Sequence, residues 1–319
     1  MAVVDLGKDE TMNTNEVIDI AIVGGGPGGM QAALVLARTR KKIVVFDDPR
    51  PPRNAASHGV HNFLGLDGLL PADIRRIAWE QIERYKSAEL RTERIVDIRH
   101  DDNGDFLVTN DQGDKVTARH LILAFGYHDI HPNIPGFAEC WGDTIIPCPF
   151  CDGYENRDRT WGIVGSSADE ISSFPLMAHN WTSDIKVMLA ADAELAPPYK
   201  AQLSELGIPI HRGSITEILH RDGKVEAVAL DSGERVDVGT LLWVPPEKPS
   251  PLVQNLVDNL GLDLNEYGHI AANQMGQTNI DRLWAAGDVQ GWTGAIESAY
   301  AGGMAAFFIA HGWHGKPLT

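Results

Sequence analysis

The first regular feature of the chain is a short apolar run that ends in glycines. Residues Ile18 to Val23 read IDIAIV, and the segment 24–29 that follows reads GGGPGG. Apolar residues then recur at helical spacing, at Met30, Ala33, Leu34 and Ala37. A second apolar run covers Ile43 to Phe46. This pattern predicts a strand, a glycine turn, a helix and a second strand, which together form a βαβ unit.

A second and weaker copy of the pattern lies in the middle of the chain. An apolar run over 160–164 precedes small residues at 165–168, a helix is expected next, and a strand is expected over 185–189. Two such units are the internal repeat of two-domain dinucleotide enzymes. The sequence therefore predicts an α/β protein with two Rossmann-like (three-layer ββα) dinucleotide-binding domains.

The remaining elements follow from the same periodicities and from proline. Helices are expected over 71–85 and 295–310, and strands over 93–100, 105–109, 120–124 and 283–286. Prolines mark 127–147 as a connector and 244–251 as a linker, because proline donates no backbone hydrogen bond.

Composition narrows the class of protein. The 319 residues suggest about two domains. The net charge of −17 disfavours nucleic acid and anionic membranes as partners. It either keeps the protein soluble or favours binding of a basic protein partner. No apolar run reaches the ~20 residues of a membrane span. Three cysteines make no disulfide framework, and the first seventeen residues lack a signal-like pattern, so a cytoplasmic location is expected.

The glycine cluster fits a dinucleotide site. It reads Gly24-x-Gly26-x-x-Gly29, between a predicted strand and a predicted helix. The glycines permit a tight turn and close approach of a pyrophosphate, which then faces the positive end of the helix. Asp47 follows eighteen residues after Gly29, at the end of the next strand, where it can accept a hydrogen bond from a ribose hydroxyl.

A pair of cysteines, Cys148-Pro149-Phe150-Cys151, is the second motif. Its spacing suits a redox disulfide. It also suits a zinc site completed by His128 and His131, or two inert buried thiols. A dinucleotide site on the same chain favours the redox interpretation.

Other candidates are weaker when taken singly. Cys140 is expected to be a small buried hydrophobe. His58 and His61 lie in a loop, either as proton shuttles or as solvated side chains. Gly287-Asp288, between a strand and a small-residue helix, suits a site where a backbone and a carboxylate approach a ribityl chain and a flavin.

The second glycine turn departs from the dinucleotide pattern. Residues 162–168 give no clean G-x-G-x-x-G, and the strand end at 188–192 has no arginine beside it. A 2′-phosphate requires an arginine there. The second site is therefore predicted to be unfit for NADPH.

Together these motifs resemble the low-molecular-weight thioredoxin reductase family of flavoproteins. The resemblance runs from about Ile18 onward, through the glycine motif, LILAFG at 121–126, CPFCDG at 148–153 and AAGDV at 285–289. It implies a homodimer and an FAD domain built from residues 1–126 and 246–319. It also implies a smaller inserted domain, 127–245, that resembles an NAD(P)H domain and carries the cysteine pair.

The resemblance also implies roles for individual residues. Cys151 would face the flavin, Cys148 would attack the substrate, and Asp152 would be the acid/base residue. The family's FAD-binding pattern matches Gly24, Gly26, Gly29, Asp47, Gly126, Gly287 and Asp288, and Ala295 falls where a backbone amide contacts the flavin ring.

Departures from the family point to a subgroup. The family's H-R-R stretch reads Leu189-Ala190-Ala191 here, and its R-Q-A triplet reads Thr293-Gly294-Ala295. The chain is closer to dithiol oxidases and to reductases with non-nicotinamide donors. We therefore expect an FAD-dependent enzyme, independent of NADPH, acting on a dithiol or disulfide in a small molecule or thioredoxin-like protein. The alternatives are an NADPH-dependent thioredoxin reductase and a non-catalytic or zinc-binding flavoprotein.

Overall fold

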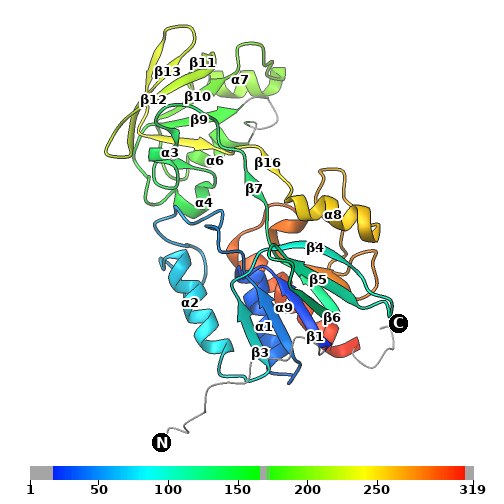
Figure 1. Cartoon of the computed structure of the whole chain (residues 1–319). Helices are drawn as coiled ribbons and strands as arrows, with labels where there is room; N and C mark the ends of the chain where they lie inside the picture. Colours follow the sequence, from blue (N-terminus) through cyan, green and yellow to red (C-terminus); the bar gives the residue numbers. More distant parts are fainter. Residues whose placement is uncertain (1–16, 166–170, 172, 313–319) are drawn as a thin grey trace, which may run out of the picture. The chain divides into compact units, whose positions relative to one another are not determined.

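The computed structural model describes residues 17–165, 171 and 173–312, and the chain divides into two compact units (Figure 1). Unit 1 is discontinuous and comprises the chain up to residue 50, residues 75–127 and the chain from residue 249. Unit 2 comprises residues 51–74 and 128–248. The sequence predicts that 51–74 belongs to the first segment of the dinucleotide domain, but in the structure this stretch belongs to unit 2.

Unit 1 is built on a parallel sheet that contains the predicted βαβ unit. Its strands run in the order β3-β2-β1-β6, with β17 beside β6. Their bounds are β1 Ile18–Val23, β2 Ile43–Phe46, β3 Ala88–Arg91, β6 Lys115–Leu123 and β17 Leu283–Ala285. The first part of β6 also pairs antiparallel with β5 (Phe106–Asn110), which pairs with β4 (Ile95–His100). Because β6 serves both pairings, it begins five residues before the predicted 120–124.

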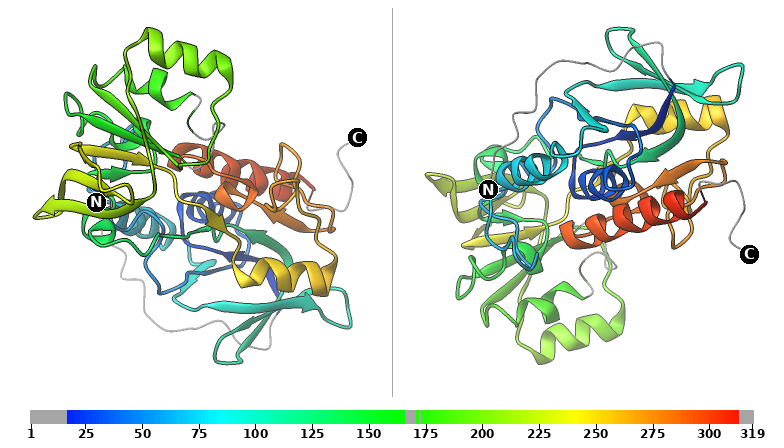
Figure 2. Two further views of the ribbon diagram at one scale, coloured as in Figure 1. Left: turned by 90° about the horizontal axis from the view of Figure 1, so that it is seen from above. Right: turned by 90° about the horizontal axis from the view of Figure 1, so that it is seen from below.

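Both faces of the parallel sheet are covered, which explains why its strands are apolar throughout. On one face Ala21 and Val23 join a core with α8 (Pro251–Leu260). On the other, Ile20 and Ile22 join α1 (Pro27–Ala37) and α9 (Ala295–Gly312), which lie side by side (Figure 2). The helix α2 (Pro71–Ile82) ends three residues before its predicted end.

Unit 2 holds the second predicted repeat. Its five-stranded parallel sheet has the order β11-β10-β9-β15-β8. The bounds are β8 Ile145–Ile146, β9 Trp161–Gly165, β10 Ile185–Leu189, β11 Ile210–Arg212 and β15 Thr240–Trp243, with helices α6 Phe174–Ala178 and α7 Pro197–Glu205. A three-stranded antiparallel sheet adds β12 Ile215–Arg221, β13 Lys224–Leu230 and β14 Arg235–Asp237. The small-residue turn at 166–168 lies outside the described residues.

Two segments predicted to be irregular contain regular elements. The connector 127–147 contains β7 (His128–Asp129), α3 (Phe137–Cys140) and β8. The linker 244–251 contains β16 (Glu247–Lys248), which pairs antiparallel with β7. The linker also holds the start of α8, because Ser250 caps the helix and proline is tolerated at the first helical position.

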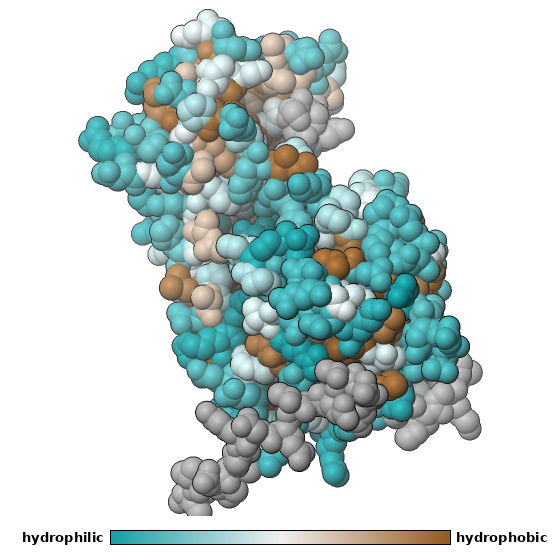
Figure 3. Space-filling view, in the orientation of Figure 1, coloured by the Kyte–Doolittle hydropathy of each residue, from teal (hydrophilic) through white to brown (hydrophobic). Residues whose placement is uncertain are grey.

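The surface in view is largely hydrophilic. Hydrophilic side chains cover most of the face drawn in Figure 3. No helix in the described part of the chain is long and apolar enough to cross a membrane.

Candidate active site

The glycine turn of unit 1 requires glycine for steric reasons. Gly24 has φ +116°, and a Cβ there would lie 2.2 Å from the carbonyl oxygen of Ala124. A Cβ at Gly29 would lie 1.8 Å from the carbonyl oxygen of Gly24. The turn therefore brings β1, α1 and β6 closer together than any side chain allows.

The same turn leaves room for a ligand. Gly26 precedes α1, and no side chain caps the helix. Nothing lies within 4 Å of the positions that a Cβ would take at Gly26 and at Gly126. An uncapped helix start beside open space fits the pyrophosphate of a dinucleotide.

Asp47 is already engaged with the protein. Its Oδ1 accepts a hydrogen bond of 3.1 Å from the Gly25 amide, and its Oδ2 pairs with the Arg75 guanidinium. Burial lowers the pKa of Arg75. Asp47 thus holds the glycine turn in place, and Arg75 is a partner that its position in the sequence did not suggest.

Asp288 is anchored by one of the residues that depart from the family pattern. It lies in a short 3-10 helix, η1 (Gly287–Gln290), just before α9. Its Oδ1 accepts hydrogen bonds from the Thr293 amide (3.2 Å) and the Thr293 hydroxyl (2.8 Å). Ala295 is the first residue of α9. Thr293 therefore fixes the carboxylate beside the start of that helix.

The cysteine pair lies in unit 2 at the start of a single helical turn, α4 (Pro149–Asp152). The Cys151 thiol donates to the Cys148 sulfur at an Sγ–Sγ distance of 2.7 Å. Cys148 is buried, with 3% of its surface exposed, and Cys151 is half-buried. The hydrogen bond from Cys151 lowers the pKa of Cys148, against the opposing effect of burial. The pair is therefore close enough for disulfide exchange, and its contact with Cys151 favours the thiolate of Cys148.

Asp152 follows the pair directly. Burial raises the pKa of its carboxyl to about 7, and the negative charges of Glu155 and Asp143 add to the rise, while His61 opposes it. A carboxyl of this pKa is divided between its acid and base forms at neutral pH, as proton transfer requires.

The raised pKa of Asp152 predicts a pH-dependent stability. In the unfolded chain the carboxyl ionises near 3.8, and in the folded protein near 7. The folded state holds the extra proton between these values, so stability falls as pH rises from about 4 to about 7 and is level above. We expect Asp152→Asn to remove this fall and to gain on the order of 3 kcal/mol over wild type between pH 4.5 and pH 8.

Urea unfolding of both proteins at the two pH values measures the effect. A constant difference in free energy of unfolding between wild type and variant would contradict the raised pKa.

A buried asparagine fixes the end of α4. The Asn156 side-chain amide donates to the backbone carbonyls of Asp152 (3.0 Å) and Asp143 (2.9 Å), and its oxygen accepts from the Thr240 hydroxyl (2.9 Å). Asn156 is 2% exposed. It ties the cysteine turn to β15. The sequence does not reveal this role, because a lone asparagine carries no local signal of such contacts.

The zinc interpretation has no support from the arrangement of side chains. Within residues 17–165, 171 and 173–312, no group of three or more His, Cys, Asp or Glu side chains could hold a metal ion. The His131 ring lies 4.5 Å from that of Trp141 and 5.3 Å from that of Phe137. Cys140 is fully buried, as expected, and burial raises the pKa of its thiol to about 11.

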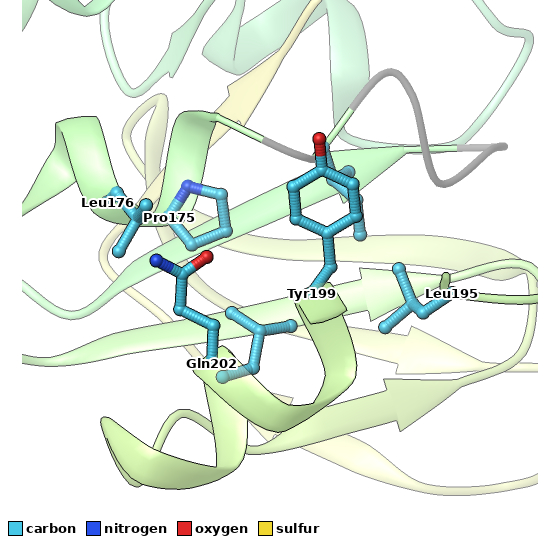
Figure 4. A pocket seen from close by; sticks show the side chains of 7 residues that line it. Pro175, Leu176, Leu195, Tyr199 and Gln202 are labelled. Atoms are coloured by element: carbon cyan, nitrogen blue, oxygen red, sulfur yellow. The ribbon is translucent and has the colours of Figure 1, made fainter. Parts of the chain in front are cut away.

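The second repeat contains a cavity and an unexpected arginine. The cavity has about 10 Å³ of space, about one water molecule, and is mostly apolar, with Pro175, Leu195 and Tyr199 among its lining (Figure 4). Arg212, at the end of β11, donates to the Ala193 carbonyl (2.7 Å) in the loop after β10. The prediction that this strand end has no arginine beside it is therefore wrong, because the neighbouring strand β11 supplies Arg212.

Known proteins share the sequence and fold of the whole chain. Residues 18–306 match the model of the pyridine nucleotide-disulphide oxidoreductase family. Thioredoxin reductase tcpT of Claviceps purpurea is 32% identical over 87% of this chain and 88% of its own. Thioredoxin reductase aclD of Aspergillus oryzae is 31% identical over 85% and 88%. The crystal structure of a putative thioredoxin reductase, TrxB from Bacillus anthracis, superposes with a TM-score of 0.85 at 28% identity, covering 93% of this chain and 99% of its own.

These matches confirm the expected α/β fold with Rossmann-type sheets and the resemblance to thioredoxin reductases. The chain belongs to the pyridine nucleotide-disulphide oxidoreductase family and is a thioredoxin reductase-like flavoprotein, an oxidoreductase that acts on sulfur groups.

Proposed function

We propose that the protein is an FAD-dependent dithiol/disulfide oxidoreductase whose Cys148–Cys151 pair exchanges with the substrate and which does not depend on NADPH. The observation that carries this proposal is the cysteine pair itself. Its sulfurs lie 2.7 Å apart, and the buried carboxyl of Asp152 follows directly.

The exchange can run in either direction, and in the oxidising direction it consumes the Cys148–Cys151 disulfide. A substrate thiolate attacks Cys148 in the Cys148–Cys151 disulfide and forms a mixed disulfide, and Cys151 leaves as a thiolate. The second substrate thiolate then attacks the mixed disulfide, releasing Cys148 and the oxidised substrate. Asp152 accepts a proton from a substrate thiol. In the reducing direction the Cys148 thiolate attacks the substrate disulfide, and the same bonds form and break in reverse.

FAD fits the residues of unit 1. The pyrophosphate would lie at the start of α1, next to the open space at Gly26 and Gly126. Gly24 and Gly29 shape the turn. Asp47 would meet the ribose, while Gly287, Asp288 and the amide of Ala295 would meet the ribityl chain and the ring. The bound flavin supplies a two-electron carrier for the dithiol.

Two features of unit 2 bear on NADPH. The end of β10, at 188–192, carries no arginine of its own, which supports independence from NADPH. Arg212 favours the alternative, an NADPH-dependent thioredoxin reductase, because its guanidinium lies beside the end of β10. In the proposed enzyme, the hydrogen bonds from Arg212 to backbone carbonyls only hold the loop after β10 in place.

An anaerobic titration of the flavin-loaded protein separates the two functions. We expect a small dithiol to bleach the flavin absorbance stoichiometrically and NADPH to leave it unchanged. Rapid stoichiometric bleaching by NADPH would establish the alternative. Two negative results together would refute the exchange. A dithiol would fail to reduce the flavin, and a small disulfide would fail to reoxidise flavin that had been reduced chemically.

We further propose that the protein is a homodimer in which α9 meets a second copy. Ile296, Tyr300 and Phe307 lie on one face of α9 and are 42%, 67% and 55% exposed. With a net charge of −17, two copies repel each other over most of their surfaces, so contact is favoured at a stripe of uncharged side chains.

A charge placed in this stripe is expected to separate the subunits. Tyr300→Glu should convert the dimer to a monomer, because it buries a carboxylate against the partner. Gln254→Glu adds the same charge to an exposed position of α8 and should leave the dimer intact. Light scattering coupled to size-exclusion chromatography gives both masses, and a dimeric Tyr300→Glu would rule out α9 as the interface.

A further inference from the structure

A closed loop of unit 2, residues 59–69, reaches the cysteine pair from a distant part of the sequence. We name it the strap. The Val60 amide donates to the Leu69 carbonyl (2.8 Å), and the Gly68 amide donates to the Val60 carbonyl (2.9 Å). The Asn62 amide donates to Asp67 Oδ1 (2.8 Å). These hydrogen bonds lie within the strap itself, so its conformation does not depend only on contacts with the cysteine turn.

Asn62 of the strap contacts the turn between the cysteines. Its side-chain Nδ2 donates to the Phe150 carbonyl at 2.5 Å. Its own backbone has φ +62°, a left-handed conformation that asparagine tolerates better than most residues. The Phe150 side chain is 61% exposed, so its burial does little to hold the turn. The hydrogen bond from Asn62 is a specific restraint on the carbonyl between Cys148 and Cys151.

His61 of the strap faces the carboxylates next to the pair. Its Nε2 lies 3.6 Å from Glu155 Oε1, and its Nδ1 lies 3.6 Å from Asp67 Oδ1. Its side chain is 24% exposed.

The charges around Asp152 are those of Glu155, Asp143 and His61. Asp143 is itself paired with Lys224, and the Nε2 atom of His58 lies 3.6 Å from Asp143 Oδ2. His61 is therefore the side chain of the strap that can offset the negative charge beside Asp152.

We propose that the strap is part of the dithiol site, with Asn62 positioning the Cys148–Cys151 turn and His61 balancing the negative charge beside Asp152, the carboxyl that moves the proton. This inference rests on the proposed function for its meaning in turnover, but the geometry of the turn can be tested without turnover. Asn62 acts through the Phe150 carbonyl and His61 through the carboxylate of Glu155, so both are positioning residues.

The first test is the pH dependence of alkylation of the reduced, flavin-loaded protein by iodoacetamide. Asn62→Gly removes the donor and keeps the left-handed backbone without strain. We expect the midpoint of the alkylation profile to rise by about half a pH unit, and dithiol turnover to fall about tenfold, because a loosened turn stabilises the thiolate less. Asn62→Asp, which replaces the donor with an acceptor, should act in the same direction. Leu64→Ala is the matched control, because Leu64 is 94% exposed at the tip of the same strap.

The second test is the pH profile of dithiol turnover in His61→Gln. Loss of the imidazole should shift the part of the pH profile that reflects ionisation of Asp152 to higher pH by about one unit, because His61 lowers the pKa of that carboxyl. In an Asp152→Asn background the same substitution should produce no further shift. Changes in melting temperature alone, with unaltered pH profiles in the Asn62 and His61 variants, would overturn the proposal.

The alkylation data keep the two ideas apart. A shifted alkylation midpoint in a protein that turns over no dithiol would sustain the strap and reject the proposed function. An unchanged alkylation midpoint in an Asn62 variant, with the wild-type enzyme active on dithiols, would sustain the proposed function and reject the role of the strap.

Discussion

Cys148→Ser and Cys151→Ser are each expected to lower dithiol turnover by at least about a thousandfold and to leave the flavin bound. A serine hydroxyl neither ionises near neutral pH nor forms a disulfide, so either substitution stops the exchange. Flavin binding should survive because the dinucleotide turn at Gly24 to Gly29 lies in unit 1, whereas both cysteines lie in unit 2. Turnover with a small dithiol and the flavin absorbance of the purified protein measure the two effects.

Cys140 provides the control for this experiment. It is a buried free thiol whose pKa is raised to about 11, and it belongs to the core of unit 2. Cys140→Ala should therefore retain turnover. Turnover that survived in either Cys148→Ser or Cys151→Ser would reject the assignment of the pair.

The two cysteines should also differ from each other. Cys148 has the lowered pKa, which supports its role as the sulfur that meets the substrate. In the reducing direction, the Cys148 thiolate of Cys151→Ser should attack a substrate disulfide, release one substrate thiolate and stay joined to the other sulfur as a stable mixed disulfide, because the variant lacks the thiol that would displace it. Cys148→Ser should form no such mixed disulfide.

Local patterns predicted the parts of the fold that depend on near neighbours. The bounds of β1 and β2 agree with the predicted apolar runs, because both faces of the sheet are buried and each strand reads as an unbroken apolar segment. The predicted helix at 295–310 is α9. The steric need for glycine at Gly24 and Gly29 also follows from a pattern of six residues.

Contacts between distant segments were not predictable in this way. Asn62 and Phe150 are 88 positions apart, and neither residue type signals the other. The same holds for Arg75 beside Asp47 and for Arg212 beside the end of β10. Such pairs form only after strands and loops from separate segments are brought together, so a single sequence gives the elements and leaves these partners undetermined.

Arg53 is the most consequential of these unpredicted partners. The pairing of β7 with β16 places Asp129 directly opposite Glu247, an arrangement of like charges that is unfavourable by itself. Arg53 resolves it: its Nε and Nη2 each lie 2.9 Å from an oxygen of Asp129, and its Nη1 lies 2.8 Å from Glu247. The Asp129 side chain is only 4% exposed, and burial raises the pKa of its carboxyl against the effect of Arg53.

The location of this ion-pair cluster adds to its importance. The chain passes between the two units after residues 50, 74, 127 and 248. Arg53, Asp129 and Glu247 each lie within three residues of one of these points. One guanidinium thus fastens three of the connecting segments to one another.

Arg53→Ala is expected to lower the free energy of unfolding by about 3–5 kcal/mol at pH 8, because it leaves the buried carboxylate of Asp129 without its partner. The loss should shrink toward pH 4.5, where protonation of Asp129 removes the uncompensated charge. Arg50→Ala, which breaks the exposed pair with Asp48, should cost no more than about 1 kcal/mol.

The double variant Arg53→Met with Asp129→Leu should recover most of the stability, since it removes both charges and leaves apolar side chains in their place. Urea unfolding of the four proteins at both pH values provides the comparison. An Arg53→Ala protein no less stable than Arg50→Ala would show that the cluster adds nothing to the fold. Equal losses at pH 8 and pH 4.5 would instead assign the effect to lost packing of the arginine side chain rather than to the stranded charge.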